Sequence, residues 1–191
     1  MEEVDTPGFP DLASEDASPQ VQEAIDRLPP LRVMRVVAHA QTAFRPWLSF
    51  GGALLGALEL EASLRELTIV FVAARMGADY ERVQHEPVVR ELGVSAQSLA
   101  AVVAGTLAES ELPAAQQLAL NFVEVLLGDP PDADAEVREM RASFSDREIV
   151  ELILLVGHYR SLCVLTNVLG VSAEAPAGLD VVRASKPPEG R

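Results

Sequence analysis

Three ionisable side chains, those of Glu66, Glu81 and His85, have the types and the spacing that acid–base chemistry needs. Glu81 and His85 are four residues apart, so on a helix they lie on the same face. An acidic neighbour favours the charged form of an imidazole, which makes His85 a usable proton donor near neutral pH. Glu–His pairs with this spacing also occur on helix surfaces without a catalytic role, so the spacing leaves both interpretations open.

Glu66 and His85 each have a second interpretation. Glu66 ends the segment Ser63-Leu64-Arg65-Glu66, which is typical of a capping box at the start of a helix. It is therefore half of a helix cap, part of a catalytic site, or both. His85 is either the proton donor or an interfacial histidine whose ring is satisfied by a carbonyl group.

Tyr80, His158 and Arg160 are the candidate substrate-binding residues. Tyr80 either lines a pocket or plugs the junction between two helices. His158, Tyr159 and Arg160 lie in a very apolar segment, so they either face a pocket or form a buried polar network. Arg160 is the candidate for holding a substrate carboxylate, because a guanidinium group binds a carboxylate through two parallel hydrogen bonds.

The composition favours one all-helical domain. The chain has 191 residues, of which 49% are hydrophobic but only 5% aromatic, so the core is built mostly from Ala, Val, Leu and Ile. The formal net charge is −14, which creates a field that repels phosphate backbones. We therefore expect no nucleic acid partner.

Single residues exclude several kinds of cofactor chemistry. Cys163 is the only cysteine, so the chain has no disulfide, no CxxC pair and no cysteine-rich metal site. Lys186 is the only lysine and lies in a Pro- and Gly-containing segment, which leaves no buried amine for a Schiff base. The three histidines form no HxxxH or HExxH pair. We expect no metal and no cofactor.

The expected domain covers residues 20–171, between a flexible acidic segment at 1–19 and a flexible tail at 172–191. Its apolar periodicity and its Pro and Gly positions predict helices over residues 20–28, 31–43, 46–58, 63–74, 81–92, 95–104, 112–127, 132–142 and 145–169. Pro46 is expected in the first turn of its helix, and Pro87 is expected to cause a kink or a restart.

Two helix starts carry capping-box patterns, at Ser63 with Glu66 and at Ser145 with Glu148. The helix after Ser63 is nearly all apolar over residues 67–74 and is expected to be buried on most sides. A buried strand is the alternative for this β-branched stretch. The last helix is apolar around most of its circumference, so we expect it to contact several neighbours, including a second subunit.

Several of these segments together resemble the carboxymuconolactone decarboxylase and alkylhydroperoxidase D superfamily. The resemblance extends over about residues 31–171 and rests on Arg65-Glu66, the segment from Asp79 to His85, Leu92-Gly93-Val94-Ser95, the segment from Leu155 to Arg160, and Asn167-Val168-Leu169-Gly170. It implies an all-α, alkylhydroperoxidase D-like fold that assembles into a homotrimer or a homohexamer.

The resemblance also distinguishes two activities. In the peroxidase branch a CxxC pair precedes the histidine, and its cysteines would lie at Ala78 and Glu81 of this chain. Because neither is a cysteine and Cys163 stands alone, no thiol peroxidase activity is expected. The decarboxylase branch instead has a glutamate four residues before the histidine, as Glu81 stands before His85.

The resemblance therefore implies a cofactor-independent lyase of decarboxylase type, or an isomerase, that acts on a small acidic lactone or another enolisable compound. Glu66 would orient or deprotonate the substrate, His85 would donate the proton, and Glu81 would hold the imidazole in position. The alternative is an oligomeric relative that has lost catalysis and serves as a binding or scaffold protein.

We expect a soluble, cytoplasmic protein with no membrane partner. The N-terminal residues are acidic and lack the basic residues of a signal peptide. The longest apolar stretch begins at Ile149, is interrupted by Glu151 and Arg160, and falls short of the roughly 20 residues that a membrane span needs.

Overall fold

A computed structural model describes residues 8–128 and 133–178, and every regular element in these ranges is a helix. The predicted all-α class is confirmed, and the alternative of a strand over residues 67–74 is wrong. The elements are α1 (Pro19–Ile25), α2 (Arg32–Val37), α3 (Gln41–Gly56), α4 (Ala62–Arg75), α5 (Asp79–Glu91), α6 (Ala96–Ala104), the short 3₁₀ helix η1 (Leu107–Glu109), α7 (Ala114–Leu127), α8 (Asp134–Met140) and α9 (Asp146–Val168).

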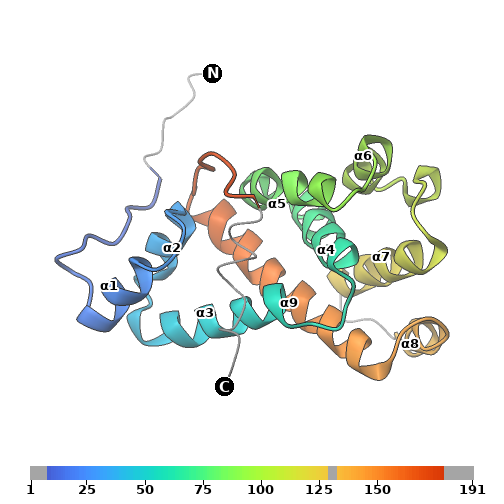
Figure 1. Ribbon diagram of the computed structural model, residues 1–191, viewed down its shortest axis with the longest axis horizontal. Helices are drawn as coiled ribbons and strands as arrows, with labels where there is room; N and C mark the ends of the chain where they lie inside the picture. The colour runs from blue at the N-terminus through green and yellow to red at the C-terminus, as the bar shows by residue number, and fades with distance from the viewer. Residues whose placement is uncertain (1–7, 129–132, 179–191) are drawn as a thin grey trace.

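Helix α4 forms the centre of the larger of two hydrophobic cores (Figure 1). It packs against α5, α6, α7 and α9, and all its residues from Ser63 to Ala73 are buried. Gly77, whose φ is +62°, follows α4 and allows the sharp turn that leads into α5. Any polar side chain in the middle of α4 must therefore find its partners inside the protein.

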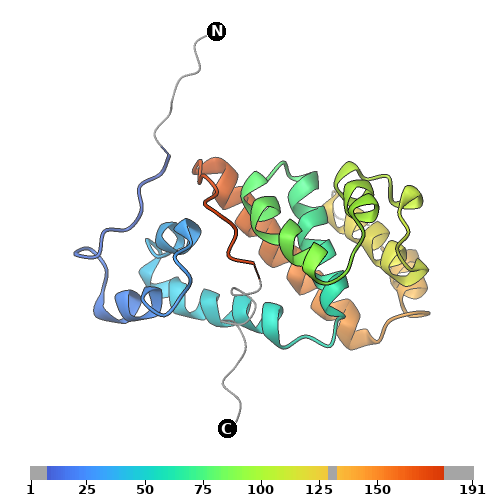
Figure 2. The same ribbon diagram turned by 45° about the horizontal axis from the view of Figure 1, so that its top comes forward.

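Helices α1, α2 and α3 surround a second core on one side of α9 (Figures 1 and 2). Tyr80 of α5 and Val171 belong to this core as well. Helix α3 approaches α9 closely at Gly51, where a Cβ atom would lie 3.1 Å from Nε2 of His158. The absence of a side chain at Gly51 therefore makes room for this imidazole between the two helices.

One of the two predicted capping boxes is present. Ser145 Oγ accepts a hydrogen bond from the Glu148 backbone N–H at 3.2 Å, and the Glu148 carboxylate accepts one from the Ser145 N–H at 2.8 Å. The box at Ser63 is wrong, because α4 begins one residue earlier and Ser63 donates its hydroxyl hydrogen to Glu61 instead. Glu66 is turned into the protein interior, so the cap does not account for it.

Other boundaries differ from the expectation in smaller ways. The helix predicted over residues 31–43 is divided, since α2 ends at Val37 and α3 begins at Gln41. Pro46 lies inside α3 and not in its first turn. Pro87 also lies inside a helix, and α5 continues through it without a restart.

Parts of both predicted tails pack on the domain. The Phe9 N–H donates to the Leu169 carbonyl at 2.9 Å, and the side chain of Leu12 is buried. The side chain of Glu174 accepts a hydrogen bond from Tyr80. The folded part therefore extends beyond residues 20–171, while the rest of the predicted tails, residues 1–7 and 179–191, lies outside the described residues.

Among the described helices, α9 is long and apolar enough, by length and composition alone, to cross a membrane. The expectation that this stretch is too short for a membrane span therefore does not hold by length and composition. However, 44% of its 18-residue apolar window, whose mean hydropathy is 1.6, is buried inside the protein. A core helix of a soluble protein meets the same criterion.

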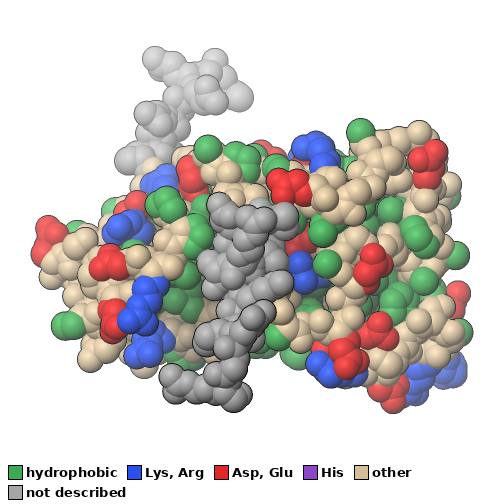
Figure 3. Space-filling view, viewed as in Figure 1, with side chains coloured by type: hydrophobic (Ala, Val, Ile, Leu, Met, Phe, Trp, Pro, Cys, Tyr) green, Lys and Arg blue, Asp and Glu red, His purple; other side chains and the backbone are tan. Residues whose placement is uncertain are grey.

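The outer face of α9 carries a row of exposed apolar side chains at helical spacing. They are Val150, Ile153, Leu154, Val164 and Val168. On the face shown in Figure 3, in contrast, acidic and basic side chains lie in small mixed groups, and no continuous basic surface is visible there. The row on α9 is interrupted between Leu154 and Val164 by the exposed Gly157 and Ser161, and exposed apolar patches of this kind are typical of protein interfaces.

We expect copies of this chain to associate through the row on α9. Val164→Asp should shift the wild-type oligomer toward monomer in analytical ultracentrifugation, because it would bury an unpaired charge in the interface. Thr42→Asp, at an exposed position of α3, is the matched control and should leave the assembly unchanged. A wild-type protein that sediments as a stable monomer at micromolar concentration would contradict this prediction.

Candidate active site

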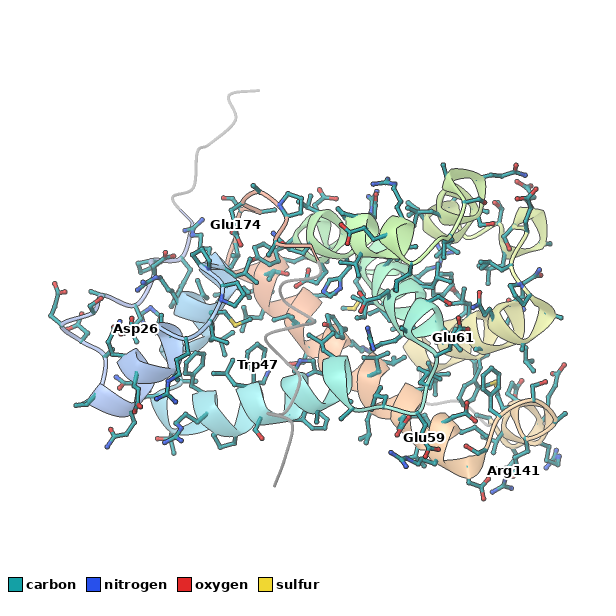
Figure 4. The ribbon with its side chains drawn as sticks, viewed as in Figure 1. Asp26, Trp47, Glu59, Glu61, Arg141 and Glu174 are labelled. Atoms are coloured by element: carbon teal, nitrogen blue, oxygen red, sulfur yellow. The ribbon has the colours of Figure 1, made fainter. Side chains whose placement is uncertain are left out.

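A cavity of about 400 Å³ lies between the two cores and is within the size range of small-molecule sites. Its walls come from α3, α5, α9 and the residues around α2. Most of the lining is apolar, and the polar side chains in it are those of Ser49, Tyr80, Glu81, Gln84, His85, His158 and Tyr159. Figure 4 shows Trp47 pointing from α3 toward this space between the helices.

Glu66 and His85 form a buried hydrogen-bonded pair at the cavity. His85 Nδ1 lies 2.7 Å from Glu66 Oε2, and the side chain of Glu66 is completely buried. Because a carboxylate only accepts, Nδ1 is the donor in this contact. Nε2 of His85 makes no hydrogen bond to a described residue, and His85 lines the cavity. Nε2 is therefore the ring nitrogen that is left for a ligand.

Arg65 binds the other oxygen of the Glu66 carboxylate. Its Nε donates to Oε1 at 3.0 Å, and the Arg65 side chain is itself buried. Burial raises the pKa of Glu66, but the hydrogen bonds and charges of His85 and Arg65 outweigh this effect and leave the pKa below its ordinary value. Glu66 is therefore a carboxylate that is held on both oxygens.

Glu81 has a different environment. Its carboxyl group is buried and accepts a hydrogen bond from the Thr166 hydroxyl, whose oxygen lies 3.1 and 3.2 Å from the two carboxyl oxygens. Burial raises the pKa of Glu81 in spite of this hydrogen bond and the nearby imidazole. The site thus holds two carboxyl groups whose pKa values are shifted in opposite directions, an arrangement that separates acid and base roles in enzymes.

The structure changes the contact that was expected to hold the imidazole. The hydrogen bond to His85 comes from Glu66, whereas Glu81, on the same helix as His85, turns toward Thr166 of α9. Helical spacing places Glu81 and His85 on one face but does not show which neighbouring helix supplies a partner. The partner here lies 19 residues away in sequence, on α4.

The three predicted substrate-binding residues have different positions. Tyr80 lines the cavity, but its hydroxyl donates to Glu174 at 2.6 Å, so it also fastens the segment after α9. His158 lines the cavity between the rings of Trp47 and Tyr159, and burial lowers its pKa to about 4.

Arg160 does not reach the cavity. It is exposed on α9 and is not among the lining residues. Two residues after His158 the helix has turned by about 200°, so the two side chains point in nearly opposite directions. The structure gives Arg160 no place as a carboxylate clamp within this cavity.

Tyr159, which the sequence analysis named beside His158 and Arg160 but left out of the substrate-binding candidates, belongs to the site. It is 3% exposed, lines the cavity, and stands edge to face with His85, with ring centroids 5.3 Å apart. No pattern in the sequence distinguishes it from the neighbouring His158 and Arg160. Within the described ranges, no group of three or more His, Cys, Asp or Glu side chains is placed to bind a metal ion.

Comparison with known proteins identifies the fold. No protein-family model and no curated protein sequence matches the chain. A solved structure titled as an alkylhydroperoxidase AhpD core, an uncharacterized peroxidase-related protein from Ralstonia eutropha, superposes with a TM-score of 0.76 over 87% of this chain and 91% of its own, at 18% identity. The chain has the alkylhydroperoxidase D core fold.

A second solved structure superposes on the chain to a similar extent. It is an uncharacterized peroxidase-related protein from a Silicibacter species, with a TM-score of 0.73, 20% identity, and coverage of 92% of this chain and 96% of its own. The fold that the resemblance implied is therefore confirmed. At this level of identity the likeness concerns the fold and leaves the activity to be argued from the site.

The pKa shifts of the two carboxyl groups predict opposite pH dependences. Because the pKa of Glu66 lies below its ordinary value of 4.5 in the folded state, its stabilising contribution is present above that pH and is lost as the pH falls through the folded pKa. The stability advantage of the wild type over Glu66→Gln should therefore shrink as the pH falls below about 4.5. Urea unfolding at a series of pH values measures this difference.

Glu81→Gln provides the contrast in the same experiment. The pKa of Glu81 is raised in the folded state, so its ionisation destabilises the protein at neutral pH and this cost disappears on acidification. The variant should be more stable than the wild type near pH 7, with a difference that shrinks as the pH falls. Parallel pH dependences for the two variants would contradict the assigned environments.

Proposed function

We propose that the protein is a cofactor-independent acid–base catalyst, a lyase of decarboxylase type or an isomerase, that acts on an enolisable small molecule in the cavity. The observation that carries this proposal is the 2.7 Å contact between Glu66 and His85. A buried carboxylate that accepts the hydrogen bond from Nδ1 fixes the orientation of the imidazole, and this leaves Nε2 to exchange protons with a ligand.

The same imidazole can serve both reaction types. In an isomerisation, Nε2 of His85 takes a proton from a carbon next to a carbonyl group and returns it to another carbon of the resulting enolate. In a decarboxylation, the bond to the carboxyl carbon breaks, the carboxyl group leaves as CO₂, the electrons of the bond form the enolate, and the imidazolium protonates the carbon. Both paths pass through an enolate, and the charge on His85 is balanced by Glu66 in each.

The alternative is a protein of this fold that binds a ligand without turning it over. A closed apolar space around His85 would favour it. The structure instead places polar side chains from α5 and α9 in one cavity, among them Glu81, His85 and Tyr159, which supports a catalytic site.

Hydrogen exchange tests the proposal without knowledge of the complete reaction. Neutral ketones, lactones and keto esters incubated with the protein in D₂O should include compounds that gain deuterium next to the carbonyl group, as followed by proton NMR. His85→Gln should slow this exchange by roughly a hundredfold, the usual scale for a positioned acid or base.

The variants of the pair define the mechanism further. Glu66→Gln should slow the same step, and the double variant should lose far less than the product of the single losses because the two residues act as a unit. His39→Gln is the matched control, since His39 is exposed and contacts only the Pro10 carbonyl among described polar groups. Exchange that is absent for every compound, or unchanged in His85→Gln, would favour the non-catalytic alternative.

Thiol peroxidase activity is not part of the proposal. Cys163 is buried in α9, and burial together with the charge of Glu81 raises the pKa of its thiol well above the ordinary value, so little reactive thiolate forms. Ala78, which occupies the position where the first cysteine of the peroxidase pair would lie, is also buried, at the N-terminal cap of α5.

We expect no turnover of peroxide with a dithiol donor, and Cys163→Ser should have the same background rate as the wild type. The rate of peroxide turnover is measured as the coupled consumption of hydrogen peroxide and dithiothreitol. Turnover by the wild type that disappears in Cys163→Ser would show that the buried thiol is reactive after all.

A further inference from the structure

The charges around the cavity set a limit on its ligand. None of the described residues that line it is a lysine or an arginine. Arg65 is the buried cation beside the Glu66–His85 pair. Its Nε–H donates a hydrogen bond to Glu66, and Arg65 does not line the cavity. Its positive charge is already balanced within the protein.

An anionic ligand would enter a site that already holds carboxyl groups. Glu81 lines the cavity, and Glu66 lies directly behind His85. His158, the second imidazole in the lining, makes no hydrogen bond to a described residue and is held in its neutral form by burial. A carboxylate would therefore lose its hydration beside Glu81 without gaining an ion pair to a lysine or an arginine, and the imidazole of His85 is already hydrogen-bonded to Glu66.

Tyr159 favours a neutral ligand, because its hydroxyl is an uncharged hydrogen-bond donor without a partner among the described residues. Tyr159 is buried and lines the cavity, and its hydroxyl makes no hydrogen bond to any described residue. Burial raises the pKa of this phenol well above its ordinary value, so the hydroxyl keeps its hydrogen. The hydroxyl is not among the completely buried polar atoms that lack a partner, so it keeps accessible surface, and a ligand oxygen in the cavity can accept its hydrogen bond.

We propose that the cavity binds a neutral, mostly apolar carbonyl compound whose oxygen accepts a hydrogen bond from Tyr159, and that it discriminates against carboxylates. This inference rests on the proposed function, for which the phenol would stabilise the negative charge that develops on the enolate oxygen while His85 moves the proton. At about 30 Å³ per water-sized group, a volume of 400 Å³ holds roughly a dozen non-hydrogen atoms.

The proposal narrows the proposed function to its isomerase branch, because the substrate of a decarboxylation carries the carboxylate that this cavity disfavours. It also narrows the substrate class that the resemblance implied. A small acidic lactone needs a cationic partner, and the residue expected to supply it, Arg160, lies on the opposite side of α9. A neutral lactone or ketone needs only a donor for its carbonyl oxygen and apolar walls for the rest of the molecule. The described lining provides both.

Three matched probes test this through the fluorescence of Trp47, the only tryptophan of the chain, which lines the cavity. They are γ-nonalactone, the tetrahydrofuran with the same pentyl chain but no carbonyl group, and the hydroxynonanoate formed by opening the lactone ring. At neutral pH the lactone should bind at least tenfold more tightly than the hydroxynonanoate.

Two variants separate the two parts of the proposal. Tyr159→Phe should weaken lactone binding by up to about tenfold and leave binding of the carbonyl-free ether unchanged, because only the lactone loses a hydrogen bond. Ser49→Arg, at an exposed position on the cavity wall, should strengthen binding of the hydroxynonanoate severalfold with little effect on the lactone.

The outcomes distinguish this inference from the proposed function. Equal or tighter binding of the hydroxynonanoate, no detectable lactone binding at millimolar concentration, or a Tyr159→Phe variant that weakens lactone and ether equally would overturn it. The binding measurements should give the same preference in His85→Gln. If that preference holds while deuterium exchange is absent for all compounds, the ligand class stands and the catalytic proposal fails.

Discussion

The carboxylate of Glu66 is the constraint around which the site is organised. It lies in the middle of α4, where every neighbouring residue is buried, and a charge in that position is tolerated only if its oxygens are paired. Arg65 binds one oxygen and His85 binds the other. The turn at Gly77 brings α5 back along α4 and so places His85 within reach of this buried charge.

The paired carboxylate determines what the other site groups can do. With Nδ1 of His85 engaged, only Nε2 is left for a ligand, and the imidazole stands edge to face with the ring of Tyr159 at the cavity. Glu81, whose pKa is raised by burial, complements Glu66 without competing for the imidazole, because Thr166 of α9 binds it instead. The site therefore combines a fixed proton carrier, a second acid and a neutral donor within one mostly apolar cavity.

The sequence predicted what depends on local patterns and missed what depends on distant partners. The helical class, the cap at Ser145 and the burial of α4 follow from composition, short spacings and apolar runs. The Ser63 pattern misled because the same residues that can cap a helix also serve a buried network. The roles of Glu81, Tyr159 and Arg160 depend on which face of α5 or α9 meets the cavity, and α9 is apolar on nearly all sides.

The tautomer of His85 is the most direct test that Glu66 fixes the imidazole. In a protein labelled with ¹⁵N and ¹³C on histidine, long-range correlation spectra recorded at a pH where the ring is neutral identify the protonated nitrogen. The hydrogen should be on Nδ1 in the wild type, with Nε2 as the free base, and this preference should weaken in Glu66→Gln. A neutral wild-type ring that carries its hydrogen on Nε2 would contradict the account.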